Sequence, residues 1–238
     1  MKINRNYIKI LTILVLIVSL YSFTNVRNNK RVLEKVDIKI LDSENLFVTH
    51  PMVNKLLIQN NVEVTNITKE KLVLNKLEEA LNSNKMVENA QVYLSVNGKL
   101  GVEIKQRTPI VRLGGNNPCY LDVNGKVMPL SPIFSARVPL VTGNVSKDNL
   151  DDIYKLAMFV RNDEFLSKNV IGIHQKGNDF ELKFRIENFV IKLGKVENLE
   201  KKFNNLKAFY QKALKDNSLN DYAIVDLQYK NQVVCAKI

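Results

Sequence analysis

The apolar stretch from Tyr7 to Phe23 constrains this chain more than any other feature of its sequence. It holds 17 residues, and its one charged side chain, Lys9, lies close to its start. A helix needs about 20 mainly apolar residues to cross a bilayer, with a lower limit near 17, and a terminal lysine can extend its amine to the headgroups. We therefore predict a membrane helix over residues 7–26, after a short tail at residues 1–6.

A cleaved signal peptide is the alternative for this stretch, because it also combines a basic start with an apolar middle. Residues 18–23, VSLYSF, contain no small-x-small cleavage site, which favours an uncleaved anchor. Charge leaves the orientation open, since three basic residues lie on each side of the span. They are Lys2, Arg5 and Lys9 before it and Arg27, Lys30 and Arg31 after it.

The net charge of +11 would at first indicate a nucleic acid or another anionic partner. Residues 1–31, however, carry six basic and no acidic side chains, which leaves +5 for the remainder of the chain. That remainder mixes lysine with glutamate and has no basic stripe interleaved with aromatic residues. We predict no nucleic-acid partner.

Two cysteines, Cys119 and Cys235, lie 116 positions apart, and no Cys-x-x-Cys motif is present. Isolated cysteines that act as small hydrophobic residues are the favoured interpretation, and a single disulfide in an oxidising compartment is the alternative.

Residues 34–107 carry the pattern of a small α+β module. Apolar and polar residues alternate from Val36 to Ile40, which predicts a strand. Helical spacings of apolar residues after Thr49 and Thr68 predict two helices. Asn97-Gly98 separates two further alternating runs, the strongest short signal for a β-hairpin. The order strand, helix, helix, strand, strand predicts a three-stranded sheet with two helices on one face.

The chain beyond Pro109 is predicted to be mostly β, with hairpin turns at Asn124-Gly125 and Gly177-Asn178. Two amphipathic helices interrupt it, and the first has Leu150, Ile153, Tyr154, Ala157 and Val160 on its buried side. The second helix is longer, and its docking on the sheet is favoured over a coiled coil because the repeat spans fewer than three heptads. Its apolar face consists of Val196, Leu199, Phe203, Leu206, Tyr210 and Ala213.

The chain closes with two strand-like segments, Ala223–Tyr229 and Gln232–Ile238, around a Lys230-Asn231 turn. The last segment has no proline and a single charge, Lys237, so it is our candidate for an unpaired sheet edge that a partner strand can extend. An internal strand is the alternative.

No catalytic or metal-binding motif is present in the sequence. His50 and His174 stand alone, and the nucleophile elbow, the phosphate-binding loop and the dinucleotide fingerprint are all absent. We predict a protein-binding protein that is not an enzyme and has no cofactor, no metal and no small-molecule substrate. An anchored extracytoplasmic cell-wall enzyme and a secreted binding protein with a cleaved signal peptide stay as alternatives.

Four segments in this order behind one apolar helix resemble the FtsQ/DivIB family of bacterial cell-division proteins. They are Leu100–Ile110, LGVEIKQRTPI; Tyr120–Gly125, YLDVNG; Val138–Gly143, VPLVTG; and Ile224–Tyr229, IVDLQY.

The resemblance implies an α+β fold with a cytoplasmic tail at residues 1–6, a transmembrane helix at 7–26 and a POTRA (polypeptide-transport-associated) module of order β-α-α-β-β at 34–108. A mixed α/β domain with a mostly antiparallel sheet follows at 109–238 and ends in a partner-binding hairpin. It also implies a single-pass type II protein of the bacterial cytoplasmic (inner) membrane, with most of the chain extracytoplasmic, at the division septum.

The function implied by the resemblance is that of a non-enzymatic divisome scaffold. Such a scaffold links early and late division proteins, contacts other divisome membrane proteins, and regulates septal peptidoglycan synthesis by binding the small coiled-coil proteins FtsB and FtsL. Gln106 stands where the family more often has Glu and Gln228 where Arg is common, so backbone pairing must carry more of the binding. By position, the binding residues are Gln228, Tyr229, Asn231, Gln232, Val233 and Val234.

Overall fold

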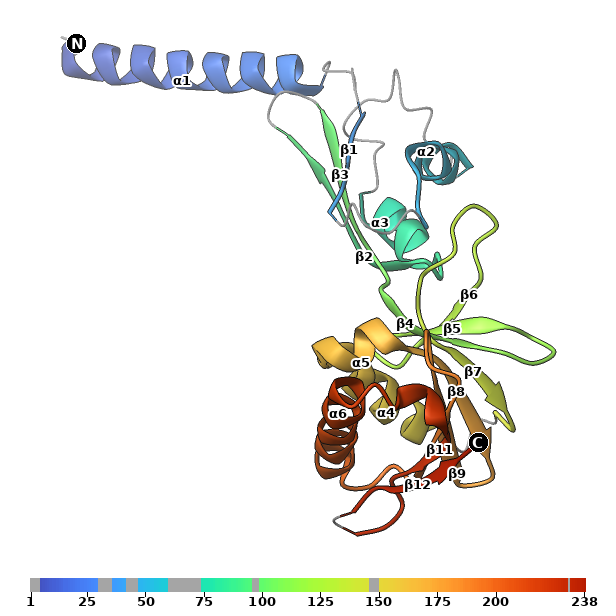
Figure 1. The fold of residues 1–238 in the computed structure, drawn as a ribbon. Helices are drawn as coiled ribbons and strands as arrows, with labels where there is room; N and C mark the ends of the chain where they lie inside the picture. Colours follow the sequence, from blue (N-terminus) through green and yellow to red (C-terminus); the bar gives the residue numbers. More distant parts are fainter. Residues whose placement is uncertain are drawn as a thin grey trace. The chain divides into compact units, whose positions relative to one another are not determined.

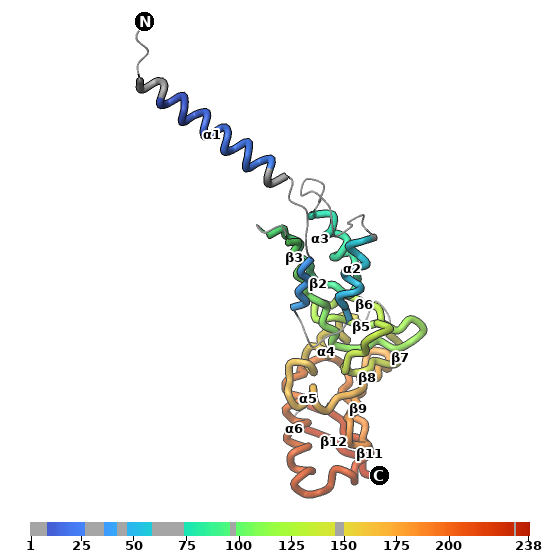
Figure 2. Tube along the Cα trace, turned by 90° about the horizontal axis from the view of Figure 1, so that it is seen from above, coloured from blue at the N-terminus to red at the C-terminus, as the bar shows by residue number. Residues whose placement is uncertain are grey.

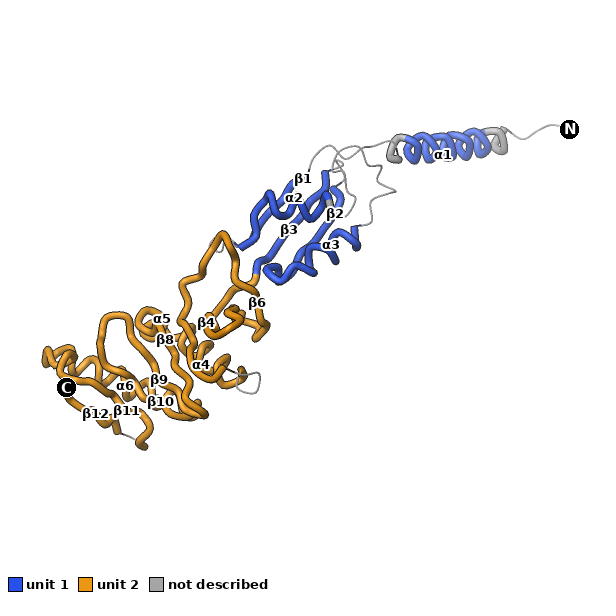
Figure 3. Tube along the Cα trace, turned by 90° about the vertical axis from the view of Figure 1, so that its right-hand side faces the viewer, with its two compact units in different colours: residues 1–106 blue, residues 107–238 orange. Residues whose placement is uncertain are grey.

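The computed structural model describes residues 5–29, 36–41, 47–59, 74–95, 99–145, 150–230 and 232–238. The chain divides into two units, residues 1–106 and residues 107–238, as Figure 3 shows. Each unit is described by itself.

The first helix, α1, runs from Arg5 to Asn29 (Figure 2). Within it, Lys9–Val26 is long and apolar enough to cross a membrane, and it is the one such helix among the described residues. Its large apolar side chains are exposed in the structure, as expected for a helix whose surroundings are lipid.

Unit 1 also contains the predicted β-α-α-β-β order (Figure 1). Its three strands follow the sheet order β1-β3-β2, in which β1 and β3 are parallel and β2 and β3 antiparallel. The expected Asn97-Gly98 turn and the Thr68 cap lie outside the described residues. The elements are β1 (Val36–Ile40), α2 (His50–Gln59), α3 (Leu74–Asn82), β2 (Val87–Leu94) and β3 (Leu100–Gln106).

Gln106, at the end of β3, has a structural part in unit 1. Its side chain is buried, and its Oε1 accepts a hydrogen bond of 2.7 Å from the backbone amide of Val48. An amide side chain can fill this position without the cost of burying the carboxylate of a glutamate.

Unit 2 is built on one nine-stranded sheet with the order β12-β11-β10-β9-β8-β7-β4-β5-β6. Five of its eight strand pairings are antiparallel, in agreement with the predicted mostly antiparallel sheet. The strands are β4 (Pro109–Leu113), β5 (Cys119–Asp122), β6 (Val127–Pro129), β7 (Leu140–Gly143), β8 (Val170–Lys176), β9 (Asp179–Phe184), β10 (Val190–Gly194), β11 (Tyr222–Asp226) and β12 (Val234–Lys237).

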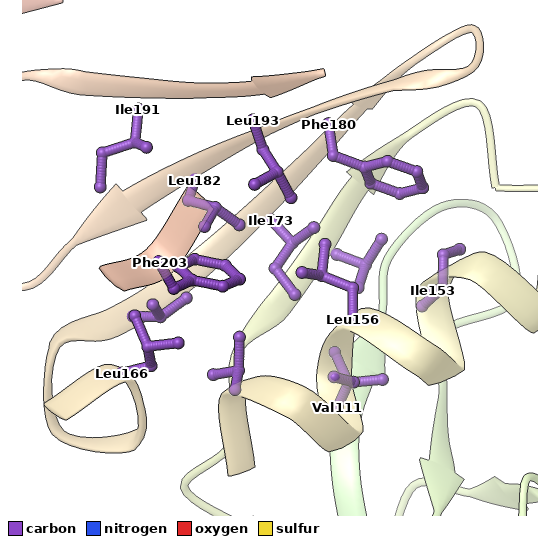
Figure 4. Close-up of a cluster of buried hydrophobic side chains, with 14 of the residues drawn as sticks. Val111, Ile153, Leu156, Leu166, Ile173, Phe180, Leu182, Ile191, Leu193 and Phe203 are labelled. Atoms are coloured by element: carbon purple, nitrogen blue, oxygen red, sulfur yellow. The ribbon is translucent and has the colours of Figure 1, made fainter. Parts of the chain in front are cut away.

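Three helices supply the other side of the unit 2 core: α4 (Leu150–Asn162), α5 (Glu164–Asn169) and α6 (Leu199–Lys215). Figure 4 shows side chains from these helices meeting side chains from the strands in one buried cluster. Phe203 and Leu206 of α6 belong to this cluster, so the predicted docking of the long helix on the sheet is confirmed. The short helix α5 was not predicted.

Asp122 is a buried residue near the start of unit 2 that accepts several hydrogen bonds. Its carboxylate is fully buried and accepts hydrogen bonds from Arg107 Nη1 at 2.7 Å and from the backbone amides of Asn124 and Lys126 at 2.9 and 2.7 Å. A buried carboxylate is tolerated only when its oxygens are paired in this way. The contacts join the segment before β4 to the turn after β5.

We expect Asp122→Ala to destabilise the protein by about 3–5 kcal/mol, because the substitution leaves the largely buried Arg107 guanidinium without its counter-charge and two backbone amides of the following turn without their acceptor. Urea unfolding followed by circular dichroism measures the loss. Asp152→Ala is the matched control, since it removes an exposed ion pair with Lys155, and it should cost less than about 1 kcal/mol. Equal losses in the two variants would contradict this role of Asp122.

Asp163 joins α5 to α6. It caps α5 by accepting a hydrogen bond from the Leu166 amide, and its other oxygen contacts Lys207 Nζ on α6. Burial alone would raise the pKa of Asp163, but the hydrogen bonds from Lys207, Leu166 and Phe165, together with the lysine charge, outweigh it and lower the pKa below its ordinary value.

The lowered pKa of Asp163 gives a pH dependence of known sign. A carboxyl group whose pKa falls on folding stabilises the protein above its unfolded pKa, about 3.9, and loses that contribution as the pH drops through the folded pKa. We expect the stability advantage of the wild type over Asp163→Asn to be constant above about pH 5 and to shrink below about pH 4. Urea unfolding at a series of pH values tests it, and an advantage that grows on acidification would contradict it.

Candidate functional site

Strand β12 forms one end of the unit 2 sheet. It pairs antiparallel with β11, and among the described residues no other strand pairs with it. The predicted edge position of the terminal segment is therefore confirmed. Both strands are shorter than predicted. Strand β11 ends at Asp226, whose Oδ1 accepts a hydrogen bond of 2.9 Å from the Gln228 amide and turns the chain out of the sheet.

Five of the six residues predicted to bind a partner lie on and beside this edge. Gln228 and Tyr229 are exposed in the connection that follows β11, and Gln232 is exposed before β12. Val233 is half-buried, and Val234 is the one member that lies within β12. The sixth, Asn231, lies outside the described residues.

The hydrogen bonds of β11 show which backbone groups of β12 point away from the sheet. The Leu227 amide donates to Lys192 O on β10, so the alternate residues Leu227 and Val225 direct their backbone toward β10. Asp226, which lies between them, directs its backbone toward β12 and pairs with Val234. Cys235 is opposite Val225, so its own N–H and C=O point to the open side of β12. Cys235 was not among the predicted site residues.

Side chains along the last strand alternate between the two faces of the sheet. Val233 and Cys235 pack against the unit 2 core, whereas Val234 and Ala236 are exposed on the opposite face. A strand added beside β12 would therefore extend the core with one set of side chains and the solvated face with the other. Cys119 and Cys235 are both free thiols, and burial raises the pKa of each.

A cleft of about 640 Å³ opens beside the connection that follows β11, and we name it the lysine cleft. Four lysines and two carboxylates line it, so its net charge is positive. Lys202, a half-buried lining residue, donates to the carbonyls of Leu193 and Lys195 at 2.7 and 2.8 Å. Its lining residues are Asp179, Gly194, Lys195, Glu197, Asn198, Lys201, Lys202, Asn205, Leu227, Gln228, Tyr229 and Lys230.

Burial lowers the pKa of Lys202, although nearby carboxylates, Glu197 first among them, act in the opposite direction. A carboxylate bound in the lysine cleft would stabilise the charged form of Lys202 and would also attract the exposed Lys195 and Lys201. The cleft thus combines two predicted site residues, Gln228 and Tyr229, with lysines from a distant part of the sequence.

The described residues include no group of three or more His, Cys, Asp or Glu side chains able to hold a metal ion. His174 Nδ1 lies 2.9 Å from Thr142 Oγ1 on the exposed face of the sheet, and His50 begins α2. Neither histidine lines the lysine cleft. The described residues of this site can therefore pair with the backbone of another strand and attract an anion.

Two known families match the chain, one in each of its two units. The family model described as "FtsQ/DivIB, C-terminal related" matches residues 108–236, more than half of the chain. The model described as "POTRA-like domain" matches residues 31–105. No curated protein sequence matches the chain.

Gly194 allows Gln228 to lie over the end of β10. The φ of Gly194 is +68°, and a Cβ added there would meet Cγ and Nε2 of Gln228 at 2.9 Å. We expect Gly194→Ala to cost about 1–2 kcal/mol through the left-handed backbone and, in addition, to displace Gln228 and speed amide exchange in residues 227–230.

Gly177→Ala is the matched control for this substitution. Gly177 has a φ of +64°, but an added Cβ would meet nothing within 4 Å. It should therefore show a similar loss of stability in urea without faster exchange at residues 227–230. Identical exchange in the two variants would contradict the role assigned to the Gly194–Gln228 contact.

Proposed function

Because the chain belongs to the FtsQ/DivIB family, we propose that it is a membrane-anchored division scaffold whose β12 edge accepts a strand from a small coiled-coil division protein of the FtsB/FtsL type. Members of this family are non-enzymatic scaffolds, and the POTRA-like match of unit 1 agrees with that architecture. The observation that carries the proposal is the unpaired side of β12, where the backbone of Cys235 points outward.

The other end of the same sheet supports the choice of β12. Strand β6 spans only Val127–Pro129 and includes a proline, which lacks the N–H that a pairing partner would need. Strand β12 has no proline, and Lys237 Nζ, its one charge, lies 6.0 Å from the centre of the Tyr222 ring on its own hairpin. The β12 edge is thus the better acceptor of the two.

The lysine cleft adds a chemical preference to the proposed edge. It lies next to Gln228 and Tyr229, where β11 ends. We infer that the partner carries an acidic side chain beside its pairing strand, and that the carboxylate contacts Lys195 or Lys201. In this chain the lysines then supply the charge that an arginine at position 228 would supply.

We further propose a type II orientation, with residues 1–6 in the cytoplasm, residues 7–26 in the inner membrane, and the remainder outside it. Residues 34–108 then form the POTRA module and residues 109–238 the partner-binding domain. The single apolar helix α1 fits such an anchor. At the septum, the scaffold would connect early with late division proteins and regulate peptidoglycan synthesis.

Substitution at Cys235 tests strand addition directly. We expect Cys235→Pro to weaken binding of the FtsB/FtsL pair by at least about tenfold, since proline removes the outward N–H and blocks the approach of a partner strand. The β11–β12 pairing should survive, because residues 234 and 236 direct their amides toward β11. Binding is measured with the full chain in detergent by biolayer interferometry.

Cys235→Ala is the matched control, as it changes the side chain and keeps the amide, and it should bind like the wild type. Removal of residues 230–238 should abolish binding. Lys201→Glu should weaken binding, while Lys215→Glu, a charge change at the other end of α6 and away from the lysine cleft, should not. Unchanged binding by Cys235→Pro would overturn strand addition, whereas unchanged binding by Lys201→Glu would overturn only the acidic contact.

A further inference from the structure

Strand β2 is an edge of the unit 1 sheet, and its sequence would suit strand addition. It spans eight residues, Val87–Leu94, with no proline and with Glu88 as its one charge. By the physical argument applied to β12, such a long edge with few charges invites another chain to pair with it. Its outer side, however, is not open.

Two side chains of α3 bind three of the outward backbone groups of β2. Asn82 Oδ1 accepts from the Ala90 amide at 2.8 Å, and Asn82 Nδ2 donates to the Ala90 carbonyl at 3.3 Å. This pair of bonds is the one that a residue of a neighbouring antiparallel strand would make. Glu78 Oε2 accepts from the amide of Val92 at 3.2 Å.

The spacing of helix and strand explains why one helix can close this edge. Glu78 and Asn82 are four residues apart, which places them about 6 Å apart along α3 and on one face. Ala90 and Val92 are alternate residues of a strand, about 6.8 Å apart, and both direct their amides to the same side. Successive helical turns therefore match successive outward amides of β2.

Packing holds α3 in the position that these bonds require. Leu77 and Leu81, on the same helix, are buried, and so are Ala90 and Val92 of β2. Glu78 and Asn82 flank this apolar contact at the rim, where their polar groups reach the backbone. The helix thus covers one face of the sheet and closes its edge with the same turns.

We propose that Glu78 and Asn82 form a clasp that closes the β2 edge of unit 1 to strand addition. The consequence that partner strands are directed to β12 rests on the proposed function, but the closure itself does not. The clasp is a specificity device, because it removes a second edge that would otherwise compete for the same extended segments.

The test uses the full chain in detergent micelles, labelled with ¹⁵N at alanine and valine, as wild type and as the Glu78→Ala/Asn82→Ala double variant. We expect amide exchange of Ala90 and Val92 to become about fivefold faster or more, which is the value of one lost hydrogen bond. The Val102 amide of the central strand β3 points to β1, so it should be unchanged and reports that the β1–β3 pairing is intact.

Association is the second readout, because an opened edge should pair with its copy in another molecule. We expect the double variant to form a dimer in light scattering at concentrations where the wild type is a monomer. Adding Ala90→Pro, which removes the outward amide and leaves the pairing with β3, should restore the monomer. The Glu78→Gln variant, which retains an acceptor oxygen, should behave like the wild type.

Unchanged exchange at Ala90 and Val92, or a double variant that stays monomeric, would overturn the clasp. If the double variant also speeds exchange at Val102, the single variant Asn82→Ala is measured in its place. Faster exchange is then expected at Ala90 only. Binding of the FtsB/FtsL pair at β12 is measured in parallel and should not change. A wild type that fails to bind the pair would overturn the proposed function and leave the clasp results standing.

Discussion

The hydrogen-bonding capacity of sheet edges is the constraint on which this structure depends. Every strand at the end of a sheet exposes N–H and C=O groups that another chain can use. Strand β6 is short and contains Pro129, β1 carries exposed Asp37 and Lys39, and the outward groups of β2 bind Asn82 and Glu78 of α3. Among the four described sheet ends, β12 combines the absence of proline with a single charge at its end, Lys237, and an outward backbone at Cys235 that pairs with no described strand, which agrees with its proposed role as the edge for a partner.

The connection after β11 places positive charge beside the backbone edge of β12. Asp226 turns the chain out of the sheet, and Gln228 then lies over Gly194, beside lysines of the segment that enters α6. A backbone edge by itself accepts many sequences, because main-chain hydrogen bonds do not distinguish side chains. Positive charge at one end of β12 adds discrimination, since a partner without an acidic residue would leave Lys201 without a counter-charge.

Periodicity in the sequence was enough to predict the order of elements in unit 1 and the two long helices of unit 2, because alternation and helical spacing record which face of each element is buried. It did not predict α5, whose six residues are too few to show a period. The end of β11 depends on one side-chain bond of Asp226. The lysine cleft and the clasp depend on tertiary structure. Lys201 and Gln228 line one cleft, and Asn82 binds the Ala90 amide, only once the sheets have formed. The outward amide of Cys235 likewise requires the register of β11 with β10 and β12.

An unprotected edge also invites a second copy of the same chain, and the charge on α6 opposes that outcome. The helix Leu199–Lys215 carries five lysines and one glutamate, and the lysine cleft lies at its beginning. Two copies joined through β12 would bring two such basic helices onto one sheet, and like charges in a shared interface cost free energy. An acidic partner experiences attraction in the same place. In the proposed binding mode, the lysines thus favour an acidic partner strand over a second copy of this chain, so β12 needs no side chains like those that close β2.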